Sequence, residues 1–412
     1  MTSVDMIEGR PLLRSADAAA GAAFASIEIH RDVAAVESLW TDLLGRALAT
    51  PYQTPAFLRA WSDHAAGHER TAPLIAVARD GDGVAVALLP FGVRRSFGLA
   101  TAVFLGGTHV NYNMPVVRRD RLAAFGAGEV ARLVRETARA GGVDLFVLRN
   151  QPTAWNGVSN PFATLPRQAA PDEGYSGPLA ESLELHLKRF VSAKTRSAQR
   201  RKMRRFEEQG VVRLYRAESA DDRERVLDAY FRQKAQRLGA RGVDNPFAAP
   251  GVDRFIRTAA GLDGGRRTVD LYGFDLAGEV IATFAVICDA DRMCGMFNSI
   301  TSGDPARYSP GELLLNFMVE DAISRGMTRF DLGVGAAAYK QMYCPDSEPL
   351  FDSIFGVTAL GRAVAAAAAA KTAAKARIKA NPTAYGLIER LRKLRAKPVG
   401  ATETAAAKEP VD

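Results

Sequence analysis

The chain has 412 residues, 47% of them hydrophobic and 24% charged, which is the balance of a folded globular protein rather than a disordered one. No apolar run approaches the roughly 20 residues that a membrane helix needs, and the first residues lack the pattern of a signal peptide. Three cysteines with no CxxC spacing are typical of a reducing compartment, so we expect a cytoplasmic protein of two or three domains.

The positive charge is concentrated in one segment. The net charge is +8, and residues 188–205 carry nine cations and no acid, so the rest of the chain sums to −1. The segment is predicted to be helical, with Arg196, Arg200 and Arg204 on one face. Such a helix attracts an anionic ligand, or it is only a solvated face. A second basic stretch follows the Ala-rich run that begins at residue 363, where contact with a membrane surface is an alternative to a solvated tail.

The first half of the chain is predicted to alternate strands and amphipathic helices. Apolar spacing and turn residues give a strand at 26–31, helices at 33–47 and from 55, strands at 74–79, 84–94 and 102–105, a polar loop at 106–113, a helix at 121–140 and a strand at 143–149.

The second half repeats this order. We expect a strand at 211–216, helices from 221 and at 252–260, strands at 268–275, 280–288 and 293–300, a helix at 310–325, a strand at 328–334, a short helix near Tyr339 and a strand at 350–357. Corresponding strands in the two halves start 185 residues apart, which indicates a duplication; two unrelated α/β domains are the alternative.

The order of elements resembles that of the GNAT acyltransferase superfamily, and specific residues resemble its CelD-like branch, which is associated with exopolysaccharide synthesis and related to FemAB-type tandem GNAT proteins. The residues that carry this resemblance are Arg200–Lys202, Gly210, Tyr230-Phe231, Lys234, Arg237, Asp244, Phe247, Tyr308–Leu314, Phe330–Gly333 and Tyr339-Lys340, with Pro51–Pro55 and Gly106–His109 in the first half. The resemblance implies an α/β (α+β) fold of two tandem GNAT-like domains, 26–180 and 181–360. Each is a mixed, mainly antiparallel sheet flanked by helices, between a flexible N-terminus (1–25) and a basic helical tail (361–412).

The start of the helix at 310–325 is suited to bind an anion. Pro is favoured at a first helical position, Gly311 lets a ligand approach the backbone, and the free N–H groups and the helix dipole attract negative charge. The resemblance implies that Arg307, Ser309 and Gly311 bind the pyrophosphate of acetyl-CoA or another acyl-CoA. The loop has one glycine where the family usually has two, and an ordinary capped helix is the alternative reading.

The resemblance also assigns the chemistry of acyl transfer. No histidine follows His186, so a histidine base within the second half is excluded. A tyrosine at the place of Tyr339 commonly protonates the leaving thiolate in GNAT enzymes, and Tyr343 is the substitute. Each could equally be a packed aromatic residue.

Further polar residues complete the candidate site. Asp331 and Glu312 could orient or deprotonate the amine, Asn298 and Ser299 could line the acyl channel, and Lys340, Arg200, His109 and Asn111 could bind the substrate. Structural hydrogen bonding is the alternative for these groups. The cysteines lack the neighbours that a metal site needs, so no metal is expected.

The sequence thus predicts transfer of an acyl group, most simply acetyl, from acyl-CoA to a small-molecule or glycan-precursor amine, with no DNA partner. Two alternatives stay open. One is a FemAB-like transferase that uses aminoacyl-tRNA and holds the RNA phosphates with residues 188–205. The other is a catalytically degenerate GNAT scaffold in a polysaccharide-synthesis complex.

Overall fold

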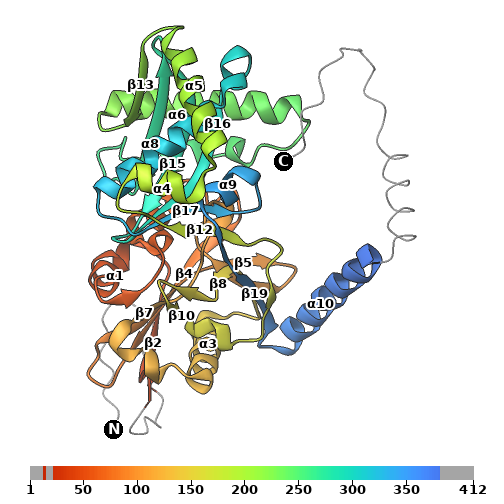
Figure 1. Ribbon diagram of the computed structural model, residues 1–412. Helices are drawn as coiled ribbons and strands as arrows, with labels where there is room; N and C mark the ends of the chain where they lie inside the picture. Colours follow the sequence, from red (N-terminus) through yellow and green to blue (C-terminus); the bar gives the residue numbers. More distant parts are fainter. Residues whose placement is uncertain (1–12, 15–21, 381–412) are drawn as a thin grey trace, which may run out of the picture.

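The computed structural model describes residues 13–14 and 22–380, with side chains for 22–370, and these residues form two large sheets with flanking helices and a two-stranded sheet (Figure 1). The elements of the first half are β1 (Leu13–Arg14), β2 (Ser26–His30), α1 (Glu37–Leu44), β3 (Ala47–Leu48), α2 (Pro55–His64), β4 (Thr71–Arg79), β5 (Ala85–Ser96), β6 (Leu99–Phe104), β7 (Val116–Arg118), α3 (Ala127–Gly141), β8 (Leu145–Pro152), β9 (Ala154–Trp155), β10 (Val158–Ser159), β11 (Gln168–Ala169) and β12 (Gly174–Pro178).

The second half repeats the pattern of strand, helices, three antiparallel strands, helix and strand. Its elements are α4 (Leu183–Phe190), α5 (Ala193–Glu207), β13 (Val212–Arg216), α6 (Ala220–Ala240), α7 (Val252–Ala259), β14 (Val269–Leu276), β15 (Glu279–Cys288), β16 (Arg292–Ile300), α8 (Pro310–Ser324), β17 (Arg329–Val334), α9 (Ala338–Tyr343), β18 (Asp346–Glu348), β19 (Leu350–Gly356) and α10 (Ala359–Ala380).

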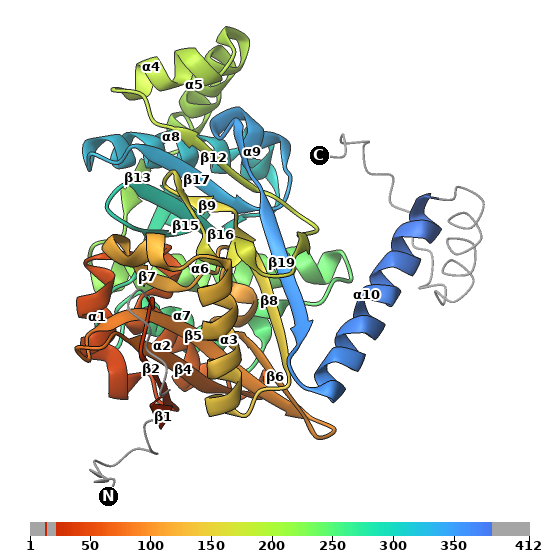
Figure 2. The ribbon, with the colours of Figure 1, turned by 90° about the horizontal axis from the view of Figure 1, so that it is seen from below.

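The two sheets exchange strands. The first sheet runs β1-β2-β4-β5-β6-β8-β19-β11 and the second runs β13-β14-β15-β16-β17-β12-β18. Strand β19, from the end of the second half, therefore pairs with β8, and β12, from the end of the first half, pairs with β17. Figure 2 shows β19 passing from the second sheet down to the first. The chain crosses between the two halves twice, and the crossing strands tie them together.

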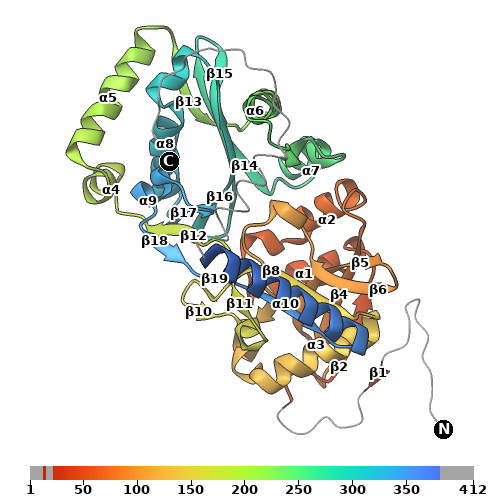
Figure 3. The same cartoon turned by 90° about the vertical axis from the view of Figure 1, so that its right-hand side faces the viewer.

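Helices cover both faces of the second sheet. In Figure 3, α8, α5 and α4 lie on one side of β14–β17, and α6 and α7 lie on the other, next to α2 of the first half. Phe57 of α2 and Phe255 of α7 meet with ring centroids 5.3 Å apart, inside a hydrophobic core that both halves share. This shared core places the loop that contains His109 against the second half.

Three expected helices have different bounds. The helix expected at 121–140 is a 3-10 helix, Arg119–Ala124, followed by α3, because Gly126 adopts an extended conformation at the N-cap. The helix expected at 33–47 begins with a 3-10 turn, Ala34–Val36, and α1 ends at Leu44. The single helix expected over 188–205 is broken between α4 and α5, where the Ser192 hydroxyl caps the second helix. Of the basic helical tail expected at 361–412, residues 381–412 lie outside the described residues.

Candidate functional site

The candidate site lies where two neighbouring strands of the second sheet separate. Strands β16 and β17 run parallel and pair only over Arg292–Cys294 and Arg329–Asp331. Both strands then continue, β16 to Ile300 and β17 to Val334, without pairing to each other. On its other edge β16 pairs with β15, and there it contains a bulge. Phe297 pairs with Ala285 and Gly295 pairs with Val286, so β16 has one extra residue between these pairs. Beyond the pairs that β16 makes with β17, the backbone polar groups of the two strands do not bond to each other, and the region between the two diverging strands is called the opening below.

Tyr339 and Asn298 meet beside this opening. Tyr339 lies on α9, which follows β17, and its hydroxyl accepts a hydrogen bond of 3.3 Å from Nδ2 of Asn298 on β16. Burial raises the pKa of Tyr339, and the Asn298 amide and the Arg237 charge act against this shift. The phenol is therefore protonated at neutral pH and can donate a proton. Two of the predicted residues are thus brought together.

Ser299 points the other way. Successive side chains of a strand alternate between its faces, and the Ser299 hydroxyl donates to Gln233 of α6 over 2.7 Å and contacts the Thr283 hydroxyl at 2.8 Å. Its side chain is only 3% exposed. These contacts are those of a structural group rather than of an acyl-channel lining.

The start of α8 is occupied by a lysine from the basic helix. Lys202 of α5 donates to the Ser309 hydroxyl over 2.9 Å and to Oε2 of Glu312 over 3.1 Å. Ser309 has a φ of 51°, and Gly311 follows it in the first turn. Arg307 is exposed, and its ion pair is with Asp304. Sequence reasoning missed Lys202 as a site residue because a run of nine cations does not show which of them turns inward.

Lys340 and Tyr343, next to Tyr339 on α9, are tied into the protein. Lys340 donates to the Val334 carbonyl over 2.8 Å, and burial lowers its pKa. The buried Tyr343 hydroxyl donates to Oδ1 of Asn316 over 2.6 Å and accepts from Gln199 over 3.0 Å. Both side chains hold α9 against neighbouring elements, and the amine of Lys340 lies at the end of β17 rather than in open solvent.

The predicted first-half residues reach the second half. Nδ2 of Asn111 donates to the Gly295 carbonyl over 2.9 Å, at the point where β16 and β17 separate, and also contacts the Tyr52 hydroxyl at 3.0 Å. His109 lies between the rings of Phe247 and Phe255, and burial lowers its pKa to about 4. Asn111 is thus beside the site, whereas His109 is a neutral ring in the interface.

Asp331 is the centre of a buried network between the halves. It is 0% exposed, and its oxygens accept from the Tyr112 hydroxyl at 2.9 Å, the Gly333 N–H at 2.6 Å and the Arg292 guanidinium at 3.1 Å. Burial raises its pKa to about 6, against the opposing effect of Arg292. Its described contacts are structural. Tyr112 lies in the polar loop expected at 106–113, but the sequence did not pair it or Arg292 with Asp331, because these residues come from distant parts of the chain.

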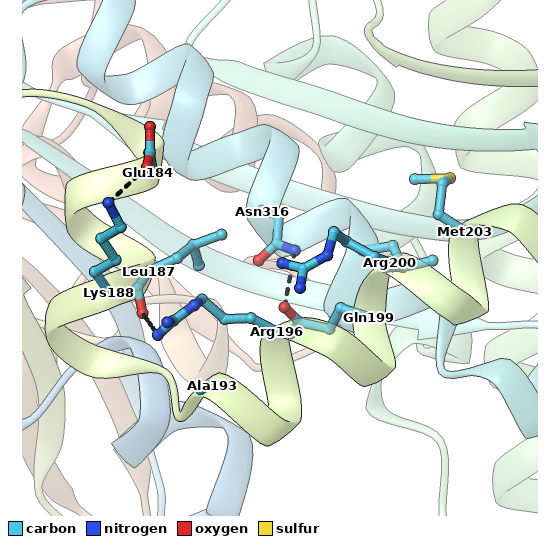
Figure 4. A pocket seen from close by; sticks show the side chains of 10 residues that line it. Glu184, Leu187, Lys188, Ala193, Arg196, Gln199, Arg200, Met203 and Asn316 are labelled. Carbon is cyan, nitrogen blue, oxygen red and sulfur yellow. Dashed lines mark hydrogen bonds and ion pairs between the residues drawn. The ribbon is translucent and has the colours of Figure 1, made fainter.

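Arg200 lines a separate pocket between α4, α5 and α8 (Figure 4), with a cavity volume of about 470 Å³. Leu187, Met203 and Leu313 supply apolar surface there. Arg196 lines the same pocket, and its guanidinium donates to the Val191 and Leu187 carbonyls at the end of α4. Arg200 is thus not brought together with Tyr339.

Two general features of the described residues are relevant to function. These residues contain no cluster of three or more His, Cys, Asp or Glu side chains arranged to hold a metal ion. Among the same residues, none of the helices combines the length and apolar character needed to cross a bilayer.

Comparisons with known proteins bear on the fold and on part of the second half. Residues 193–341 match the family model of the acetyltransferase (GNAT) domain. A search of curated proteins found no match. Among solved structures, FemX is 9% identical with a TM-score of 0.54, over 79% of this chain and 96% of FemX.

Two other solved structures match with lower TM-scores. A tandem GNAT protein from the clavulanic acid biosynthesis pathway is 13% identical (81% and 99% of the two chains, TM-score 0.44). The L-PGS of Bacillus licheniformis is 12% identical (72% and 90%, TM-score 0.44).

The chain therefore has the mixed α/β fold of two tandem GNAT-like domains. The family match of residues 193–341 supports the GNAT superfamily and acyl transfer in general for the second half.

Proposed function

We propose that the second half transfers an acyl group from acyl-CoA to an amine. The observation that carries this proposal is the meeting of Tyr339 and Asn298 beside the opening between β16 and β17. In this reaction the amine nitrogen attacks the thioester carbon, a C–N bond forms, and the C–S bond breaks. The Tyr339 hydroxyl gives its proton to the leaving thiolate, and the protonated amide loses a proton to solvent.

The start of α8 fits the pyrophosphate of the acyl donor in charge. The helix dipole, the Ser309 hydroxyl and the Lys202 ammonium converge there, and Gly311 adds no side chain. The Glu312 carboxylate disfavours phosphate at this helix start, because it is negatively charged and already pairs with Lys202. Lys202 would therefore exchange Glu312 for a phosphate oxygen when the donor binds.

The resemblance to the CelD-like branch supports a narrower version of the proposal. In that version the acceptor is a sugar nucleotide or another precursor of a polysaccharide or cell-envelope polymer, and the enzyme acts in the cytoplasm. Acetyl-CoA is the simplest donor.

Calorimetry with acetyl-CoA tests the proposal. We expect binding to the wild-type chain, and a loss of at least tenfold in affinity for Gly311→Glu, which adds a like charge where phosphate would lie. Gly128→Glu in the first turn of α3 is the matched control, since it adds the same charge to a helix start in the other half. Failure of the wild-type protein to bind acetyl-CoA or longer acyl-CoAs would refute the proposal.

A second candidate donor is favoured by the surface of α5. Arg200, Arg201 and Arg204 are exposed and have no ion-pair partner among the described residues. Such a free cationic face is suited to RNA phosphates, as an aminoacyl-tRNA-dependent transferase would require. Binding of tRNA that weakens steeply with salt, together with absent acetyl-CoA binding, would favour this donor. A degenerate scaffold would bind neither.

A further inference from the structure

A cluster of aromatic rings lies behind the candidate site, on the α6 face of β16. The rings of Tyr230, Phe247 and Phe297 pack with centroids 4.4 to 5.5 Å apart. The Tyr230 hydroxyl is buried and has no hydrogen-bond partner among the described residues, which is uncommon for a buried polar atom. The Tyr230 hydroxyl can therefore accept or donate a further hydrogen bond within an otherwise apolar cluster.

A lysine lies over these rings. Nζ of Lys234 is 5.4 Å from the ring centroid of Phe247 and 5.9 Å from that of Tyr230. The Lys234 side chain is half-buried. Desolvation lowers its pKa most, and the charge of Arg237 lowers it further. The ring faces offer a favourable surface to a cation, but they do not neutralise it.

Lys234 and Arg237 form a like-charged pair without an acid. They are three residues apart on α6, so they lie on the same face of the helix. Neither has an ion pair or a side-chain hydrogen bond with another described residue, whereas Lys202 and Arg292 each have a carboxylate partner. Lys234 is half-buried and Arg237 is exposed, and an anion between them would offset the repulsion of the two charges.

The pair is connected to the reacting groups. Phe297, which contacts Tyr230 and Phe247, directly precedes Asn298, the hydrogen-bond partner of Tyr339, so the ring cluster and the reacting groups lie on opposite faces of β16. The charge of Arg237 also acts on the Tyr339 hydroxyl, whose pKa it lowers against the effect of burial. Because β16 and β17 do not pair beyond Cys294 and Asp331, an acceptor whose anionic end lies at this pair can extend past the unpaired edge of β16 toward Tyr339.

We propose that Lys234 and Arg237 bind an anionic group, a carboxylate or a phosphate, of the acceptor amine, and so select acidic acceptors. The ligand is called an acceptor here because this assignment rests on the proposed acyl transfer. The binding of an anion by Lys234 and Arg237 does not depend on that reaction. The two cations fix one end of the acceptor, so that its amine is presented toward Asn298 and Tyr339. The two unpaired charges lower the stability of the free protein, and the bound substrate supplies the anion that pairs with them.

Amine labelling tests the anion site without a known substrate. The lysines are acetylated with an N-hydroxysuccinimide ester, and the rate at Lys234 is measured by peptide mass spectrometry with pyrophosphate, succinate or sodium chloride at equal ionic strength. We expect pyrophosphate, succinate or both to slow the labelling of Lys234 in a saturable way. Lys194, which is exposed on α5, is the internal control and keeps its rate.

Variants distinguish protection by a bound anion from a general effect of salt on labelling. Arg237→Gln should weaken the protection by about tenfold, the loss of one charge-assisted hydrogen bond. Arg232→Gln, an exposed arginine of the same helix, should leave it unchanged. Lys234→Met should keep or raise the melting temperature, because it removes one of two like charges and retains the apolar stem.

The outcomes distinguish the sources and the two proposals. Protection by pyrophosphate alone assigns a phosphate-bearing acceptor, and protection by succinate alone assigns a carboxylate. Equal labelling of Lys234 under all three salts overturns the assignment, as does protection that Arg237→Gln leaves intact. A protein that shows protection but does not bind acyl-CoA would retain the anion site and refute the proposed donor.

Discussion

Adjacent residues in this protein differ sharply in what they contact. On β16, Asn298 meets Tyr339 while Ser299 bonds to Gln233. On α9, Tyr339 borders the opening while Lys340 is only 8% exposed and bonds to the end of β17. The cause is the period of each element, which sends neighbouring side chains in different directions. Candidate roles therefore have to be assigned residue by residue.

Removing the Tyr339 hydroxyl should affect chemistry more than stability. General acid catalysis contributes about 100- to 10,000-fold, so Tyr339→Phe should lower turnover by at least about 100-fold and leave donor affinity near that of the wild type. Steady-state kinetics and calorimetry with acetyl-CoA measure the two effects. Full turnover in this variant, with chemistry shown to be rate-limiting, would exclude Tyr339 as the acid.

Tyr343→Phe is the matched comparison on the same helix. Its hydroxyl is buried and bonds to Oδ1 of Asn316 and Nε2 of Gln199, so its removal takes one partner from each amide, although Nδ2 of Asn316 still donates to Oε1 of Gln199. Such a loss costs about 1–3 kcal/mol of unfolding free energy, and denaturant unfolding would show it. Turnover should stay within a few fold of the wild type. A large loss of turnover with unchanged stability would move the acid to Tyr343.

At the scale of residues, the sequence could predict types but not surroundings. The order of elements placed Tyr339 on a short helix after a strand, and α9 confirms that helix. The burial of Asp331 and Lys340 was not predictable, because the groups that cover Asp331 include Tyr112, which is 219 residues away. The sequence around a carboxylate at the end of a strand does not show whether that carboxylate faces solvent or a second domain.

At the scale of elements, periodicity predicted most of the fold. The strands expected at 268–275, 280–288, 293–300 and 328–334 are confirmed within one residue, because alternating or continuous apolar runs mark buried strands. The break between α4 and α5 was missed because charge dominates that segment and obscures the apolar spacing. The approach of α5 to α8 through Lys202 followed from no pattern in the sequence.

The contact between α5 and α8 predicts opposite effects for two variants. Lys202→Met removes a cation from the start of α8 and should weaken acetyl-CoA binding by about tenfold, whereas Glu312→Gln frees Lys202 and removes a competing charge, and should strengthen it. Both side chains are partly exposed, so the loss of their ion pair should cost less than about 1 kcal/mol of stability.

Calorimetry with both variants and with Arg201→Met measures the effect. Arg201 is exposed on the same helix and has no ion-pair partner among the described residues, so it controls for a general loss of positive charge. If Arg201→Met weakens binding as much as Lys202→Met does, the effect comes from the net charge of α5 rather than from the start of α8.

At the scale of the whole molecule, the two halves act as one folded body. They exchange β12 and β19, share one hydrophobic core, and meet at the opening through Asn111 and the Gly295 carbonyl. The repeated order of elements predicted two similar halves. It could not predict the exchange, because pairing between strands far apart in sequence leaves no local pattern.

This interface contains a titratable group whose protonation should weaken the protein. His109 lies between Phe247 and Phe255, and burial lowers its pKa to about 4, against about 6.5 in an unfolded chain. Below pH 6.5 the unfolded chain binds a proton that the folded chain does not. The contribution of the neutral ring is therefore complete above pH 6.5 and is lost as the pH falls toward 4, by about 3 kcal/mol in total.

His109→Phe keeps an aromatic ring in the interface and removes the proton, so its unfolding free energy should fall less than that of the wild type between pH 7 and pH 4. Denaturant unfolding at four or five pH values measures the difference. His186, whose pKa burial also lowers to about 4, is present in both proteins, so its contribution cancels in the comparison. Parallel pH profiles for the two proteins would contradict the prediction, because they would mean that His109 gains its proton as readily in the folded chain as in the unfolded one. A variant profile that is flatter only below pH 6.5 would locate acid sensitivity at the contact between the two halves.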